Sequence, residues 1–158
     1  MLRQVLCAAV VAALAVGVAA AAEPIKVELK DFKMMPKNEG TPAELIGYNE
    51  GEGKLFYYVH GTGTAEVKVP EDGEYTITIE ASCDEANKML AKIKVSVDET
   101  VVAKEFALKE ATAKEYPFTA KLKKGTPKLA IEFLNDEFKE GEYDLNLYLH
   151  SVKLEKKK

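Results

Sequence analysis

Arginine, tryptophan and cysteine are almost missing from this sequence of 158 residues. The chain has no tryptophan, two cysteines, and Arg3 as its single arginine, with a formal net charge of −4. Bidentate arginine contacts and a positive electrostatic field supply much of a protein's affinity for phosphate backbones. The composition therefore argues against a nucleic-acid partner and suits neutral or cationic ligands better.

Residues 1–22 have the pattern of a secretory signal peptide. Arg3 precedes an apolar run over 5–18, and a cluster of alanines follows. An uncleaved membrane anchor is the alternative, but the apolar run is short for a full span and the alanines before Glu23 suit cleavage. We therefore expect a protein that begins near Glu23, is secreted or held in the periplasm or cell envelope, and has no membrane contact after cleavage.

Cleavage would leave Cys83 as the only cysteine, so no internal disulfide could form and the fold would be held by burial alone. The remaining 136 residues are enough for one domain with one core. Cys83 could pair with another chain or act as a nucleophile, but a lone cysteine beside a strand is more often a small buried hydrophobe.

Apolar and polar residues alternate through most of the chain, which is the period of strands with one buried face. The clearest run has Tyr75, Ile77, Ile79 and Ala81 on one side. The other predicted strands are Ile25–Phe32, Leu55–His60, Ala65–Val69, 93–97, Val101–Leu108, 116–122, 129–134 and 147–154. Within Leu55–His60, one of the neighbours Tyr57 and Tyr58 must point inward, and core packing is the expected role of that pair.

Turn sequences separate these strands, and no long amphipathic helix interrupts them. The predicted turns include Gly61–Gly63, Pro70–Gly73, Asp98–Glu99 and Lys123–Pro127. A short segment, Cys83–Leu90, has room for one helical turn. This pattern predicts an all-β, single-domain, antiparallel β-sandwich of jelly-roll type.

Three regions of the chain follow the predicted leader. Residues 23–64 are expected to form an N-terminal strand and an irregular excursion of the same domain, because glycine and proline punctuate 33–54. Residues 65–155 are expected to form the sandwich, and 156–158 a basic tail. A terminal lysine run is usually a solvated end.

The last predicted strand changes phase. Leu147 and Leu149 are separated by an odd number of positions from the next apolar pair, Val152 and Leu154. Both pairs can face one core only if an extra residue is inserted between them. We therefore predict a β-bulge near His150 and Ser151.

Four oxygen-bearing side chains gather at the two ends of the final hairpin: Asn135, Asp136, Asp144 and Asn146. With hard oxygen donors and no thiol, such a set favours calcium over zinc or copper. Calcium accepts about six to eight oxygens, so positions would remain open for two adjacent sugar hydroxyls. The alternative is that these residues only form the turn, since Asn and Asp favour turn conformations for local reasons.

Four runs of the chain resemble the calcium-dependent xylan-binding carbohydrate-binding modules of families 36 and 60. They are GEYTITIEAS at 73–82, KIKVSVDETVV at 92–102, YPFTAKLKKGTPKLAIEFLND at 116–136 and YDLNLYLHSVKL at 143–154. The most specific match is the family pattern around the hairpin, met here by Phe133, Asn135, Asp136, Asp144, Asn146, Leu147 and Tyr148. The resemblance implies a β-sandwich in which Asp136 and Asp144 bind calcium, with Asn135 and Asn146 in support.

The sequence departs from the family pattern at two places. Leu145 stands where the family usually has arginine, and Leu149 with His150 replaces valine and aspartate. Without tryptophan, the candidates for sugar contacts are Phe138, Tyr143 and Asn146, with the tyrosine pair at 57 and 58 as lesser ones. Glu28 and Asp31 could contribute to a second calcium site, as in related modules.

Signatures of catalysis are missing. The sequence has neither an HExxH pattern nor a GxSxG elbow, and its only histidines are His60 and His150. We therefore expect a secreted, monomeric, non-catalytic module that binds xylan or a related glycan through calcium. The alternatives are an envelope structural or interaction protein with at most a structural calcium, and a small secreted hydrolase.

Overall fold

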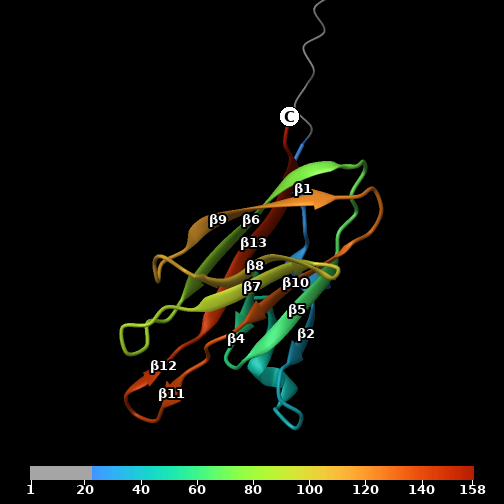
Figure 1. The fold of residues 1–158 in the computed structure, drawn as a ribbon. Coiled ribbons are helices and arrows are strands. Elements are labelled where there is room, and N and C mark those ends of the chain that lie inside the picture. Colours follow the sequence, from blue (N-terminus) through green and yellow to red (C-terminus); the bar gives the residue numbers. More distant parts are fainter. Residues whose placement is uncertain (1–22) are drawn as a thin grey trace, which may run out of the picture.

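The computed structural model describes residues 23–158, and the predicted signal peptide at 1–22 lies outside them. Two antiparallel sheets pack face to face (Figure 1), which confirms the predicted all-β sandwich. No helix among the described residues is long and apolar enough to cross a membrane.

The first sheet has the strand order β3-β4-β13-β6-β9, and β1 pairs with the far half of β13. Its strands are β1 (Ile25–Lys26), β3 (Ile46–Asn49), β4 (Lys54–Tyr57), β6 (Gly73–Cys83), β9 (Lys114–Leu122) and β13 (Leu147–Lys156). The two longest strands, β6 and β13, lie side by side at its centre.

The second sheet has the order β2-β5-β10-β7-β8. Its strands are β2 (Lys33–Pro36), β5 (Gly61–Glu66), β7 (Lys92–Val97), β8 (Thr100–Ala107) and β10 (Lys128–Phe133). A separate small hairpin pairs β11 (Phe138–Lys139) with β12 (Tyr143–Asp144), and short 3-10 helices cover Leu29–Asp31 and Ala43–Leu45.

The alternating apolar side chains face the space between the sheets. Tyr75, Ile77, Ile79 and Ala81 are each at most 1% exposed, and the inward sets of 93–97, 116–122 and 129–133 are also buried. Tyr57 is fully buried while its neighbour Tyr58 is 39% exposed, so the pair divides between core and surface as the strand period predicts.

Cys83 lies in this core as well. Burial raises the pKa of its thiol, and the sulfur accepts a hydrogen bond from Ala91 N. A buried thiol with a raised pKa is a poor nucleophile, which favours the structural role for this cysteine.

The predicted bulge is confirmed. The pairing of β13 with β6 shifts register between Leu149 and Ser151, which leaves His150 as the extra residue. As a result Leu149 and Val152 are both buried although they are three positions apart.

The structure of residues 25–54 differs from the prediction in both halves of this region. The predicted strand Ile25–Phe32 is instead a two-residue strand followed by a 3-10 helix that buries Leu29. The predicted irregular stretch 33–54 contains β2 and β3. The segment 83–90 forms a tight turn rather than a helical turn, with Asn87 and Lys88 at positive φ.

The Gly61–Gly63 turn prediction is wrong, because both glycines lie within β5. A Cβ atom on Gly63 would lie 2.6 Å from the Tyr57 Oη atom, and one on Gly61 would lie 2.5 Å from Ile46 Cδ1. These glycines are therefore explained by close packing under neighbouring side chains, which a sequence pattern does not distinguish from a turn.

Candidate functional site

The segment between β10 and β13, residues 134–146, forms a projection at one end of the sandwich (Figure 1). The β11-β12 hairpin makes up its tip, with Gly141 at positive φ in the turn. At its base, Leu145 N donates a hydrogen bond to Glu137 O at 2.8 Å. The Leu145 side chain is fully buried, so the residue that replaces the family's arginine belongs to the core.

Asn135 anchors the start of this segment. Its Oδ1 accepts a hydrogen bond from Lys92 N at 2.5 Å, and its Nδ2 donates to Leu90 O at 3.1 Å. Both ends of the amide therefore have backbone partners from the segment that enters β7. The contacts give Asn135 a structural task, and its proposed part in metal binding stays a prediction.

Asp136 is held by a residue that is distant from it in the sequence. Its backbone N–H donates to His60 Nε2 at 2.9 Å. The carboxylate oxygen Oδ1 is buried and has no hydrogen-bond partner. Burial raises the pKa of Asp136, nearby Asp144 raises it further, and His60 acts in the opposite direction.

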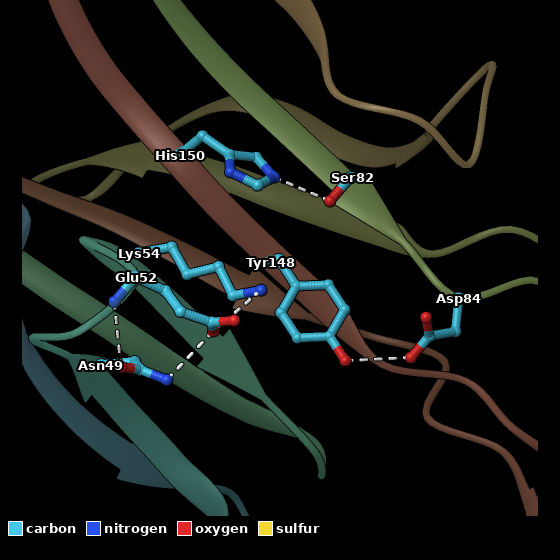
Figure 2. Close-up of polar contacts among 7 residues, drawn as sticks. All are labelled: Asn49, Glu52, Lys54, Ser82, Asp84, Tyr148 and His150. Atoms are coloured by element: carbon cyan, nitrogen blue, oxygen red, sulfur yellow. Dashed lines mark hydrogen bonds and ion pairs between the residues drawn. The ribbon is translucent and has the colours of Figure 1, made fainter.

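Asn146 links two carboxylates. Its Nδ2 donates to Asp144 Oδ2 at 3.1 Å and to Asp84 Oδ2 at 3.0 Å. Asp84 follows the end of β6 and also accepts a hydrogen bond from the Tyr148 Oη at 3.0 Å (Figure 2). Asp84 is not among the residues that the sequence pattern predicts for this site, because alternation does not show that β6 lies beside β13.

Two buried side-chain oxygens in the described residues have no hydrogen-bond partner, and both belong to this site: Asp136 Oδ1 and Asn146 Oδ1. Unpartnered buried oxygens are costly and call for an explanation such as a bound ion. No ion pair to lysine involves Asp84, Asp136 or Asp144 within residues 23–158, although ten ion pairs neutralise other carboxylates there.

The carboxylates of this site can hold calcium only together with other oxygen donors. In the described part of the chain, no three His, Cys, Asp or Glu side chains converge closely enough to hold a metal by themselves. A calcium ion here would need the Asn146 amide oxygen and further oxygens from backbone, water or a guest in addition to the carboxylates. Calcium tolerates such mixed and irregular oxygen shells.

Aromatic side chains lie near the projection. Phe138, on β11, is 68% exposed, whereas Tyr143 on β12 is partly buried against the core. On the outer face of the first sheet, exposed Tyr58 packs edge-on against Tyr148, with ring centroids 6.3 Å apart. Whether Phe138, Tyr143 or Asn146 contacts a ligand stays a prediction.

The fold is that of the β-sandwich carbohydrate-binding modules. A family 35 carbohydrate-binding module from Clostridium thermocellum has a TM-score of 0.57 at 14% identity, over 84% of this chain and 98% of that one. The mannan-binding module from Man5C has a TM-score of 0.54 at 18% identity, over 83% and 97%. The C-terminal family 6 module of the laminarinase LamC from Zobellia galactanivorans has a TM-score of 0.53 at 14% identity, over 85% and 100%.

The family itself is shown by sequence. The model of family 60, described as a Ca-dependent, xylan-binding carbohydrate-binding module, matches residues 76–158. The chain belongs to this family, as the hairpin motif indicates. No curated protein matches the sequence.

Proposed function

We propose that this protein is a secreted, non-catalytic module that binds xylan or a related β-glycan through a calcium ion at the end of the final hairpin. Asp136, Asp144 and Asn146 would supply oxygens from the protein, and two neighbouring sugar hydroxyls would complete the coordination. The family description supports calcium and xylan, and the signal-peptide pattern supports secretion.

One observation carries the proposal. The two unpartnered buried oxygens of the described residues, on Asp136 and Asn146, lie in the same short segment and beside carboxylates without lysine partners. A divalent cation would satisfy both oxygens and offset the burial and the repulsion from Asp144 that raise the pKa of Asp136.

Isothermal titration calorimetry with xylan tests the proposal. Binding should be present with calcium, disappear with a chelator, and return when calcium is added in excess. Mannan and laminarin serve as matched neutral polysaccharides that define the sugar preference. Xylan binding of equal strength in the chelator would contradict the mechanism.

A structural role for calcium is the second candidate, and buried Leu145 favours it. The family pattern has arginine at this position, and a leucine in the core cannot provide the polar contacts to a sugar that arginine can. If this candidate holds, calcium raises the melting temperature while no glycan on an array binds.

Hydrolysis has one structural feature in its favour, a hydrogen bond of 2.7 Å between Ser82 Oγ and His150 Nε2 (Figure 2). In the Ser-His-Asp arrangement, a carboxylate orients the histidine through its other ring nitrogen. Among residues 23–158 no such hydrogen bond to His150 is found. We therefore propose a non-catalytic protein, and turnover of a glycan or ester panel would overturn that.

A further inference from the structure

The side-chain amide of Asn146 has only one chemically acceptable orientation. Its Nδ2 lies 3.0 Å from Asp84 Oδ2 and 3.1 Å from Asp144 Oδ2. Ionised carboxylates only accept hydrogen bonds, so a flipped amide would place its oxygen against two negative oxygens. With both N–H groups committed in this way, Oδ1 must point elsewhere, and it does so as a buried atom without a partner.

Asp84 is joined to Asn146 twice. Asp84 N donates to Asn146 O at 3.0 Å, and the Asn146 amide returns a hydrogen bond to the Asp84 carboxylate. Their neighbours in the chain, Cys83 and Leu147, are paired at the adjoining ends of β6 and β13. The main chain thus fixes the distance between the two residues, and the side chains fix the amide.

Tyr148 limits the freedom of the Asp84 carboxylate. Its hydroxyl donates to Asp84 Oδ2 (Figure 2). The same oxygen accepts a hydrogen bond from Asn146 Nδ2. Asp84 therefore receives two hydrogen bonds on one oxygen.

We propose that Asp84 is a positioning residue, which holds the Asn146 amide so that Oδ1 faces the calcium ion without itself binding the metal. The inference rests on the proposed calcium site and adds a residue that the hairpin motif does not contain. Residues that orient metal ligands in this way typically contribute roughly tenfold to a hundredfold in metal affinity.

The test is calcium binding in the absence of sugar, measured by calorimetry on the wild-type protein, Asp84→Ala, Asp84→Asn and Tyr148→Phe. Asp84→Ala should weaken calcium binding by roughly tenfold to a hundredfold. Asp84→Asn keeps an oxygen that accepts from Asn146 and should stay within about threefold of wild type. Tyr148→Phe removes the other hydrogen bond to the same oxygen and should also bind nearly normally.

Side-chain amide signals of Asn146 in an NMR spectrum of the calcium-free protein give an independent readout. Asp84→Ala should shift the signal of the proton that faces Asp84, whereas Asp84→Asn should largely preserve it. This readout does not depend on the metal, and the spectrum also reports whether each variant is folded.

The outcomes separate this inference from the function it rests on. If the wild-type protein does not bind calcium, both are overturned. If the wild type binds and Asp84→Ala binds equally well, only the role of Asp84 is overturned. An equal loss in Asp84→Ala and Asp84→Asn would show that the charge itself holds the metal, and would overturn the positioning role. If Asp84→Ala does not fold, a large loss of calcium affinity in Asp84→Asn would still overturn the positioning role.

Discussion

The two ends of the sandwich use the same residue types in opposite ways. At the end away from the projection, Asp72 accepts hydrogen bonds from Lys123 Nζ and Lys124 N, both at 2.8 Å, and Asp98 accepts one from Lys128 N at 2.8 Å. At the projection, Asp136 and Asn146 each have a buried oxygen with no partner. Donors from the protein itself satisfy the oxygens of Asp72 and Asp98, whereas within residues 23–158 the buried oxygens of Asp136 and Asn146 lack such donors.

The electrostatic consequences are opposite as well. The hydrogen bond from Lys123 holds the pKa of Asp72 below its ordinary value. Burial raises the pKa of Asp136. One end therefore stabilises its carboxylates with lysine side chains and backbone amides, and the other leaves Asp136 Oδ1 without a partner among the described residues.

The strongest test of this difference compares the same substitution at the two ends. Asp144→Ala should reduce calcium-dependent xylan binding by at least about a hundredfold, because it removes a proposed anionic calcium ligand from an exposed position. Asp72→Ala, the matched control, should bind like wild type. Calorimetry measures both, and circular dichroism should show the sandwich intact. If the two variants bound xylan equally well, the carboxylates at the two ends would not differ in function.

A second test measures the stability of variants at Leu145, at the base of the projection. Leu145→Arg restores the arginine of the family pattern but places a charge at a fully buried position. We expect the free energy of unfolding to fall by about 3–5 kcal/mol, while Leu145→Met, of similar volume, should change it by less than about 1.5 kcal/mol. Urea denaturation measures both values. An arginine variant as stable as wild type would show that the side chain can reach solvent.

A smaller effect is expected at the tip. Phe138→Ala removes an exposed aromatic ring beside the site and should weaken xylan binding by roughly threefold to tenfold, about 1 kcal/mol. Val101→Ala, at another exposed apolar position on β8, is the control. Calcium affinity without sugar should be unchanged in both. A loss of calcium binding in Phe138→Ala would instead assign Phe138 a role in shaping the loop.

The smallest effect concerns the calcium-free protein. Asp136→Asn should stabilise it by on the order of 0.5 kcal/mol at neutral pH, because a partly buried carboxylate is replaced by a neutral amide and solvent screens the rest. Asp72→Asn should lower the melting temperature slightly, because it removes the ion pair with Lys123.

The pH dependence of these two variants has opposite signs. Because the pKa of Asp136 is raised in the folded state, the wild-type protein gains stability as the pH falls through that pKa, so the advantage of Asp136→Asn should vanish in acid. Because the pKa of Asp72 is lowered, its contribution is present at neutral pH and is lost in acid. Thermal melts in a chelator, over a range of pH, would show parallel curves if the two carboxylates were equivalent.

The sequence alone predicts the features that depend on residues close together in the chain. Strand alternation predicts the buried faces, and the change of phase after Leu149 predicts the bulge. The oxygen residues of the hairpin are visible for the same reason. His60 and Asp84 are not, because they meet Asp136 and Asn146 across 76 and 62 positions. Such contacts depend on which strands become neighbours, and alternation alone does not determine strand order.

The bulge in β13 determines how this strand should respond to the deletion of one residue. Losing one residue from a strand normally turns every later side chain to the opposite face. Loss of His150 would instead give Leu147, Leu149, Val152 and Leu154 an unbroken two-residue spacing, all on the core side. This strand therefore contains a position where a single-codon deletion should spare the hydrophobic pattern, and a cooperative melt of that shortened protein would demonstrate it.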